Sequence, residues 1–294
     1  MKILLTGSTG FLGSRILQEC PKNHEIISLG RGVANSIPWN LKSGVPALGK
    51  YQAVIHCAGF AHKIPANSSE EKEVFDVNVN GTQNLLNAFD NTGYLPESFI
   101  YISSVSVYGV EHGILLDENT PVKPISAYAK SKLEAEHLVQ DWCNLHKINC
   151  LILRLPLLVG PSAPGNLGQM QRAIQRGYYF RLGDGAARRS MVAAKDVATF
   201  IFEVIGKSGI YHLTDGTHFS YAEIENAIAK KYNRKIRKIP LILALCAAKL
   251  GDVISAFPMN TYRLNKLKNT LTFSDEKARK ILGWNVLGIP ESEF

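Results

Sequence analysis

A tyrosine and a lysine stand four residues apart in the segment PISAYAKSKLEAEHL, at Tyr128 and Lys132. On a helix this spacing places both side chains on one face, with Cβ atoms about 6 Å apart. A free phenol, with a pKa of about 10, is a poor base at neutral pH, and a nearby positive charge favours its ionised form. The pair therefore predicts an acid/base tyrosine whose pKa is lowered by its lysine neighbour.

Three glycines recur every third residue near the start of the chain, in TGSTGFLG, at Gly7, Gly10 and Gly13. Residues 2–6 (KILLT) have the pattern of a short buried strand, and residues 11–19 that of a helix. In such a unit the first glycine permits a tight turn, the second lets a pyrophosphate approach the backbone, and the third lets helix pack closely on strand. Free N–H groups and the helix dipole attract phosphate. The segment predicts a dinucleotide site.

Two serines follow a strand expected at residues 99–103 (FIYIS). They are Ser104 and Ser106, in SSVSVYG. In a parallel sheet, ligands bind beyond the carboxyl ends of the strands, and Ser104 stands at such an end, where its hydroxyl can hold a substrate oxygen. Together with the glycine turn and the tyrosine–lysine pair, this indicates a nicotinamide-dependent oxidoreductase.

The surrounding pattern alternates strands with helices. Further strands are expected at 25–29, 53–56 and 150–154, and helices at 74–89 and 132–146. This alternation indicates βαβ units and an α/β fold with a Rossmann-type, doubly wound parallel sheet. We expect residues 1–157 to form the dinucleotide-binding domain, and residues 158–294 mainly a smaller C-terminal substrate-binding lobe that begins in the Pro- and Gly-rich LVGPSAPGNLG. Residues 209–213 can return a strand to the sheet, which would make the lobe discontinuous.

The composition suits one two-lobed enzyme or two small domains, with 294 residues of which 46% are hydrophobic and 20% charged. No internal repeat appears. The chain starts directly with the first strand and shows no signal-peptide pattern, so a cytoplasmic location is expected. The cysteines form no CxxC pair, so neither a disulfide framework nor a metal site is expected. They are Cys20, Cys57, Cys143, Cys150 and Cys246.

These segments resemble the extended short-chain dehydrogenase/reductases, in particular the NAD-dependent nucleotide-sugar epimerase/dehydratase family. The matching segments are TGSTGFLG, VIHCAG, VNVNGT, SSVSVYG, YAKSK and RRSMVAAKDVA, in the same order over almost the whole chain. The resemblance implies that Ser104 orients the substrate and that Tyr128 is the acid/base. It implies that Lys132 binds the nicotinamide ribose and, with the oxidised nicotinamide, tunes the tyrosine. It further implies that Asn78 is a structural asparagine near the site and that the protein is a homodimer.

The cofactor is expected to be NAD or NADP. NAD-binding members carry an acidic residue at the end of the second strand for the ribose 2′-hydroxyl, whereas a nearby arginine accommodates a 2′-phosphate. Here Gly30 takes the acid's place and Arg31 follows, which indicates NADP(H), unless Arg31 is only a solvated loop cation. His56 is expected to pack, without chemistry. The expected cofactor-binding residues are Gly7, Thr9, Gly10, Phe11, Leu12, Gly13, Arg31, Asn40, Leu41, Cys57, Ala58, Gly59, Asn78 and Lys132.

The substrate is expected to be a nucleotide sugar. GNLG with its following helix resembles the family's diphosphate loop, and Arg189 in RRSMV aligns with a phosphate-binding arginine, whose planar fork matches phosphate oxygens. The alternative is that Arg189 is a surface residue. Leu157 in LRLPLLVG departs from the asparagine that many members carry. The expected substrate-binding residues are Ser104, Ser106, Asn166, Leu167, Phe180 as a nucleobase contact, and Arg189.

Two reactions of UDP-hexoses or hexosamines in surface-polysaccharide synthesis stay open, 4-epimerisation and 4-ketoreduction. A preference for NADP would favour the reductase, because an epimerase regenerates its own cofactor. Dehydration is disfavoured, since Val105 and Ser106 occupy the places of the dehydratases' acidic pair. Two other classes are a reductase of small aldehydes or ketones on the same fold, and a non-enzymatic dinucleotide-sensing protein.

The net charge of +8 comes in part from a basic cluster at 230–238. Basic excess can attract nucleic acid or anionic membrane, but no nucleic-acid motif accompanies it, and a solvated helix end is favoured. The apolar stretch 239–257 is interrupted by Lys249, Gly251 and Asp252, and falls short of the roughly 20 apolar residues of a spanning helix. We expect a buried or dimer-facing helix there, no nucleic-acid partner and no stable membrane insertion, with peripheral docking left open.

Overall fold

The central sheet has seven parallel strands in the order β11-β7-β5-β4-β1-β2-β3. The computed structural model describes residues 1–61, 65–240, 242, 267–286 and 288–294. The strands of the sheet are β1 (Lys2–Thr6), β2 (Glu25–Gly30), β3 (Ile37–Pro38), β4 (Ala53–His56), β5 (Ser98–Ser104), β7 (Asn149–Leu155) and β11 (Gly209–Tyr211). This is the doubly wound order of a Rossmann sheet, so the predicted fold class is confirmed.

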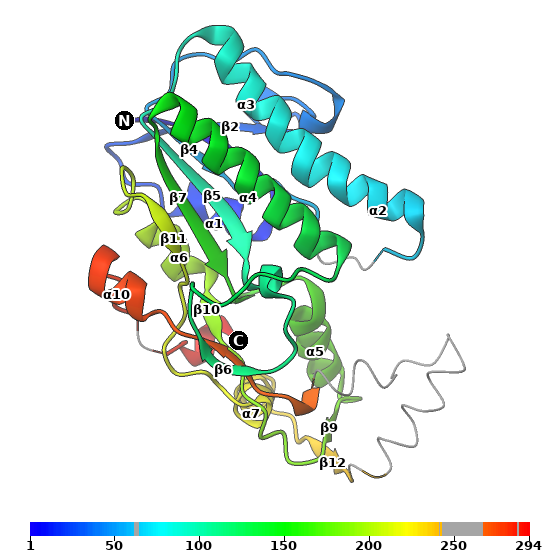
Figure 1. Cartoon of the computed structure of the whole chain (residues 1–294). Coiled ribbons are helices and arrows are strands. Elements are labelled where there is room, and N and C mark those ends of the chain that lie inside the picture. The colour runs from blue at the N-terminus through cyan, green and yellow to red at the C-terminus, as the bar shows by residue number, and fades with distance from the viewer. Residues whose placement is uncertain (62–64, 241, 243–266, 287) are drawn as a thin grey trace.

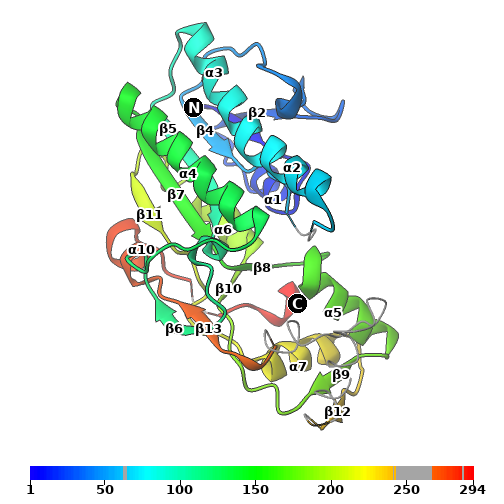
Figure 2. The same ribbon diagram turned by 45° about the vertical axis from the view of Figure 1, so that its right-hand side comes forward.

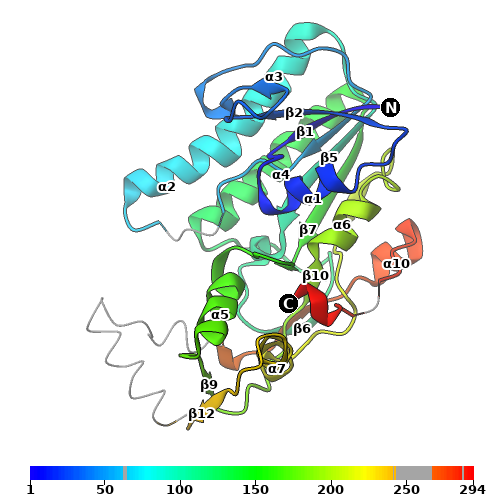
Figure 3. The ribbon, with the colours of Figure 1, turned by 180° about the vertical axis from the view of Figure 1, so that it is seen from behind.

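Helices cover both faces of this sheet (Figures 1 and 3). One face carries α1 (Phe11–Gln18) and α6 (Ala194–Phe200), and the other carries α2 (Ser68–Phe75), α3 (Gly81–Thr92) and α4 (Ala127–His146). In β1, Ile3 and Leu5 pack under α1 while Leu4 packs under α3 and α4. Because a strand with both faces covered buries its central side chains on both sides, residues 3–5 (ILL) are a continuous apolar run.

The helix expected at 74–89 contains a π-helical turn. The turn η2 (Asp76–Asn80) joins α2 to α3. Within it the buried Asn78 accepts a hydrogen bond from the Phe60 amide at 2.6 Å and donates one to Ser131 Oγ at 2.8 Å. The turn therefore links the loop after β4 to α4, which carries Tyr128 and Lys132.

A smaller lobe lies beyond the carboxyl ends of the central strands, where the substrate-binding lobe was expected (Figure 2). Its helices are α5 (Gly165–Arg176), α7 (Tyr221–Lys231) and α10 (Glu276–Leu282). Its strands pair as β8 (Leu157–Val159) with β10 (Met191–Ala193), β9 (Phe180–Leu182) with β12 (Arg237–Ile239), and β6 (Gly113–Leu116) with β13 (Leu271–Phe273). Short 3₁₀ turns are η1 (Leu41–Ser43), η3 (Val105–Tyr108) and η4 (Glu291–Glu293).

The two parts interleave along the chain. After β8, α5, β9 and β10 in the lobe, α6 returns to cover the sheet and β11 pairs in parallel with β7, with Gly209 opposite Leu151. Strand β6, from the first half of the sequence, pairs with β13 near its end. The helix expected at 239–257 falls mostly outside the described residues. Within the described part of the chain, no helix is long and apolar enough to span a bilayer.

Candidate active site

Tyr128 lies in the first turn of α4, facing the end of β5. The helix begins at Ser126, whose side chain accepts a hydrogen bond from the Ala129 amide at 3.1 Å. Burial raises the pKa of the Tyr128 phenol, and a hydrogen bond with the Ser104 side chain partly opposes that rise. Ser104 also accepts a hydrogen bond from the Ser106 amide at 3.2 Å, which begins the turn η3. The hydroxyls of Ser104 and Tyr128 therefore meet at the carboxyl edge of the sheet.

Lys132 lies one turn further along α4 and is buried. Its Nζ donates to the carbonyl oxygen of Ile102 at 2.6 Å and lies 4.1 Å from the centre of the Tyr101 ring. Burial lowers the pKa of Lys132 to about 8, with Glu136 and Cys57 acting in the opposite direction.

The expected lowering of the Tyr128 pKa involves Lys132 together with an oxidised nicotinamide, and it stays a prediction. In the protein alone, burial raises this pKa and the group that opposes the rise is Ser104. The Lys132 ammonium is held at the Ile102 carbonyl and the face of Tyr101.

A buried polar network lies beneath this lysine, and the sequence patterns did not identify it. Glu136, on the same face of α4, forms an ion pair with Arg154 of β7 at 2.7 Å. Arg154 also donates to the hydroxyl of Tyr108 at 3.0 Å, and that hydroxyl lies 2.7 Å from Nε2 of His212. Glu136 follows Lys132 by four residues, which places both on one face of α4, and this spacing was the only sign of the network in the sequence. The arginine partner of Glu136 comes from a separate strand, so no local pattern could reveal it.

The glycine turn has the close approaches that its spacing predicts. Gly7 has φ +72°, and a Cβ there would lie 2.7 Å from the Ala58 amide nitrogen. A Cβ on Gly13 would lie 2.1 Å from the carbonyl oxygen of Gly7, so helix and turn are in backbone contact. Gly10 precedes α1 without a side-chain cap, and the first turn has no acidic residue. This turn therefore leaves backbone donors for a phosphate and fits a dinucleotide.

The loop after β4 joins the glycine turn to Lys132. Ala58 packs on Gly7, and a Cβ at Gly59 would lie 3.9 Å from Nζ of Lys132. Burial raises the pKa of the neighbouring Cys57 to about 12, so its thiol stays protonated. Three expected cofactor residues are thus in contact with the turn or the lysine.

His56 has the packing role expected of it. Its ring nitrogens lie 2.6 Å from Thr6 Oγ1 and 2.9 Å from Thr82 Oγ1. Burial lowers its pKa to about 3, so it stays neutral at physiological pH.

The loop between β2 and β3 contains a residue that the sequence reasoning missed. Asn35 is buried, accepts a hydrogen bond from Ser8 Oγ and donates one to the Gly32 carbonyl at 2.9 Å. A Cβ on Gly30 would lie 2.9 Å from Asn35 Nδ2, so the carboxamide fills the space beside this glycine. Arg31 is exposed.

The other expected cofactor residues differ in exposure. Thr9 is exposed, Phe11 is partly buried, and Leu12 is buried in the core under α1. Asn40 caps the turn η1 by accepting from the Lys42 amide at 3.2 Å, and Leu41 is buried.

The expected substrate-binding residues form two groups. Ser106 lies beside Ser104, and within the described residues its buried Oγ has no hydrogen-bond partner. The others lie in the lobe: Asn166 is exposed and Leu167 buried in the first turn of α5, Phe180 is 43% exposed on β9, and Arg189 donates to the Tyr221 hydroxyl at 3.2 Å.

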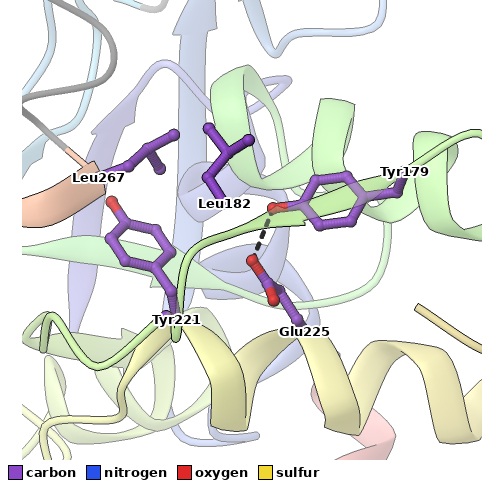
Figure 4. A pocket seen from close by; sticks show the side chains of 6 residues that line it. Tyr179, Leu182, Tyr221, Glu225 and Leu267 are labelled. Atoms are coloured by element: carbon purple, nitrogen blue, oxygen red, sulfur yellow. Dashed lines mark hydrogen bonds between the residues drawn. The ribbon is translucent and has the colours of Figure 1, made fainter. Parts of the chain in front are cut away.

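A small pocket lies in the lobe, and Tyr221 forms part of its wall (Figure 4). Tyr179 donates to Glu225 at 2.7 Å across it. The remaining lining residues are Leu182, Gly185 and Leu267. With about 10 Å³ for the centre of a water molecule, it can hold one water but no sugar.

The parallel sheet, the uncapped glycine turn and the serine, tyrosine and lysine at the end of β5 together define a dinucleotide-dependent enzyme of the extended short-chain dehydrogenase/reductase type. The chain belongs to the NAD dependent epimerase/dehydratase family, whose family model matches residues 3–212. The predicted family is thus confirmed, and the family's NAD dependence supports a nicotinamide cofactor.

Similarity to individual proteins extends over nearly the whole chain. The chain is 26% identical over 282 residues to N-acetyl-alpha-D-glucosaminyl-diphospho-ditrans,octacis-undecaprenol 4-epimerase of Escherichia coli O157:H7, covering 90% of this chain and 83% of that protein. Its fold matches RMD from Pseudomonas aeruginosa complexed with NADPH, with a TM-score of 0.75, 20% identity, and 99% and 96% coverage. It also matches UDP-glucuronic acid 4-epimerase from Bacillus cereus in complex with UDP-glucuronic acid and NAD, with a TM-score of 0.76, 21% identity, and 99% and 96% coverage.

Proposed function

We propose that the protein transfers a hydride at C4 of a nucleotide sugar, with a UDP-hexose or hexosamine as the substrate class. One juxtaposition carries the proposal. Tyr128 meets Ser104 at the end of β5, while Lys132 reaches the Gly59 loop, which packs on the glycine turn at Gly7. These contacts put an acid/base, a hydroxyl that can orient a sugar oxygen and a dinucleotide cradle at one edge of the sheet.

Each residue of this set has a distinct task. When bound, the nicotinamide dinucleotide accepts or donates the hydride. Because burial raises the pKa of Tyr128, its phenol is protonated at neutral pH and can give a proton to the oxygen of a keto sugar as that oxygen gains charge. Ser104 holds the same oxygen through its hydroxyl, and Ser106, whose hydroxyl has no partner within the described part of the chain, can bond to a neighbouring sugar oxygen.

The end of β2 favours NADP(H). With Gly30 in the acid's place and Asn35 filling the space beside it, no carboxylate is present there to bind a ribose 2′-hydroxyl or to repel a 2′-phosphate. Arg31 is exposed and available to a phosphate. A cofactor exchanged at every turnover suits a 4-ketoreductase, so we favour that reaction over 4-epimerisation.

The lobe supplies candidate contacts for the nucleotide. Arg189 can form charge-assisted hydrogen bonds with the diphosphate, and Asn166 stands at the start of α5, where backbone N–H groups favour anions. The exposed ring of Phe180 is available to a nucleobase. The same contacts argue against a reductase of small aldehydes, because such a substrate has no phosphate.

A direct test combines cofactor release with turnover. The purified protein is denatured and the released dinucleotide identified by mass, and UDP-4-keto sugars with NADPH are then compared with UDP-hexoses without added cofactor. NADPH consumption with a UDP-4-keto sugar supports the reductase, whereas NAD near one per chain with interconversion of UDP-hexoses supports the epimerase. If no UDP-sugar reacts in either assay, the nucleotide-sugar proposal is wrong.

A second candidate is the same C4 chemistry on a sugar carried by a polyprenyl diphosphate, the substrate named for the Escherichia coli relative. The specific observation in its favour is the gathering of exposed cations at the end of the lobe, where an anionic membrane surface would be met. Both candidates present a diphosphate to the lobe. Assaying both carriers with the same sugar discriminates between them.

A further inference from the structure

One end of the lobe carries six exposed cations, which we call the distal basic face. Its residues are Arg172, Arg176, Arg234, Lys235, Arg237 and Lys238. They come from α5, from the segment after α7, and from β12. The cluster at 230–238 was expected to be a helix end, but only Lys230 and Lys231 belong to α7, and Arg237 and Lys238 lie in β12.

The fold brings the two source segments together. In the pairing of β9 with β12, Arg237 stands opposite Phe180. Arg234 donates from Nε to the carbonyl oxygen of Gln175 at 3.0 Å, which ties the second segment to the end of α5. Figures 1 and 2 show β9 and β12 at the end of the molecule that is remote from α3 and the central sheet. The cations therefore gather at the tip of the lobe.

This face lacks compensating negative charge in the described part of the chain. Residues 165–182 and 226–239 contain no aspartate or glutamate. Two cations beside the face are already engaged, since Lys230 pairs with Glu291 at 2.9 Å and Lys231 donates to the Phe294 carbonyl at 2.7 Å. Among the described contacts, none of the six cations of the face forms an ion pair with a carboxylate. Their charge is available to an anionic partner.

An exposed aromatic side chain stands among these cations. Tyr178 is 58% exposed, whereas Arg181 of β9 turns inward to Glu225 and is buried. Exposed tyrosine beside lysine and arginine is a combination found where proteins meet the headgroup region of a bilayer.

We propose that the distal basic face docks the protein peripherally on an anionic phospholipid bilayer. Basic residues close to such a surface act together, each strengthening binding by about fivefold, and their effect falls with salt. A bilayer is favoured over nucleic acid because Tyr178, two residues after Arg176, exposes its ring and the chain has no nucleic-acid-binding motif. Docking of this kind is reversible. It brings the substrate lobe to the membrane surface, whether the sugar's carrier is a nucleotide or a lipid.

Vesicle sedimentation of the full-length protein tests this proposal. We expect binding to vesicles that contain phosphatidylglycerol, little binding to phosphatidylcholine alone, and loss of binding as salt is raised. A variant with Arg234, Lys235, Arg237 and Lys238 all replaced by serine should bind at least 100-fold more weakly, while its thermal unfolding and its turnover of a soluble nucleotide sugar stay unchanged.

The matched control removes the same charge from exposed positions elsewhere, by replacing Lys22, Lys50, Lys195 and Lys207 with serine. It should bind anionic vesicles almost as the wild type does. Equal weakening in the two variants would mean that net charge alone drives binding and would overturn the docking face. Binding to a short RNA duplex without binding to vesicles would show that the partner of this face is nucleic acid and that the proposed bilayer docking is wrong. Turnover is measured in a separate assay, so neither result bears on the proposed reaction at C4.

Discussion

Lys132 donates from Nζ to the carbonyl oxygen of Ile102 at 2.6 Å, so α4 is tied by its lysine to the strand that ends in Ser104. The same ammonium rests 4.1 Å from the Tyr101 ring centre, which favours the charged form through a cation–π contact. Burial works against that charge and lowers the pKa of Lys132 to about 8. A lysine with this pKa changes its charge close to physiological pH.

Stability and activity should therefore both respond to the titration of Lys132. Its folded pKa, about 8, lies below the ordinary value of 10.5, so the unfolded chain binds more protons between these values and the free energy of unfolding rises with pH in that window. A Lys132→Met variant has no titrating group at this position, so its free energy of unfolding lacks this rise with pH. Its stability relative to the wild type should fall by about 3 kcal/mol between pH 7 and pH 10.5. Urea unfolding at several pH values measures this, and a constant difference would contradict it. Wild-type turnover should decline above pH 8 as the ammonium is lost.

Tyr128→Phe should lower turnover about 10²- to 10⁴-fold, because it removes the proton that general acid catalysis needs while leaving the ring in place. Cofactor binding, followed by fluorescence titration, should stay unchanged. Tyr94→Phe is the matched control, since Tyr94 is 57% exposed and lies outside the site. Full activity of the Tyr128 variant would show that another group moves the proton.

Arg189→Ala should raise the KM for a UDP-sugar about 10- to 100-fold, the size expected for the loss of hydrogen bonds to a charged group. Its neighbour provides the control, because Arg188 is exposed and bonds to the His218 carbonyl and to Glu223. Steady-state kinetics of Arg188→Ala should match the wild type. An unchanged KM in the Arg189 variant would point to a substrate without a diphosphate.

Asn35→Asp should shift cofactor preference from NADPH toward NADH by about tenfold or more, the equivalent of about 1.4 kcal/mol. The substitution places a carboxylate beside Gly30, where it can accept from a ribose 2′-hydroxyl and repels a 2′-phosphate. The ratio of kcat/KM for the two cofactors measures the shift. Asn144→Asp adds the same charge at an exposed position and should leave the ratio unaltered. If Asn35→Asp does not change the ratio, Asn35 does not set the cofactor preference and Arg31 is the residue that does.

Gly13→Ala should destabilise the protein by about 1–3 kcal/mol or more, the usual cost of overpacking. The reason is that the new Cβ would lie 2.1 Å from the carbonyl oxygen of Gly7. Dinucleotide affinity should fall as well, since the turn must open to admit the methyl group. Thermal unfolding with and without cofactor reports both effects. Gly49→Ala is the control, because a Cβ there meets only the Tyr51 hydroxyl at 3.9 Å. Wild-type stability of the Gly13 variant would mean that the turn tolerates a side chain.

Local sequence determined the strand–turn–helix unit at Gly7 to Gly13, the apolar run of β1 and the helical spacing of Tyr128 and Lys132. Each depends on residues within one or two turns of the chain, so spacing and side-chain size are enough to predict it. Family resemblance extended this to the roles of Ser104 and Arg189, and the comparisons confirmed the family itself. The individual site assignments and the homodimer stay predictions.

Tertiary structure alone decided which distant groups meet. Asn35 folds back on Gly30 and Ser8, Glu136 finds Arg154 on a separate strand, and Lys132 turns to the Ile102 carbonyl. The pKa of Tyr128 consequently responds to burial and to Ser104, two influences that the spacing of the tyrosine and lysine does not encode. In the same way, Arg176 and Arg237 lie at the same end of the lobe because β9 pairs with β12 and Arg234 bonds to the Gln175 carbonyl. Burial and long-range pairing are properties of the folded chain, and no local pattern encodes them.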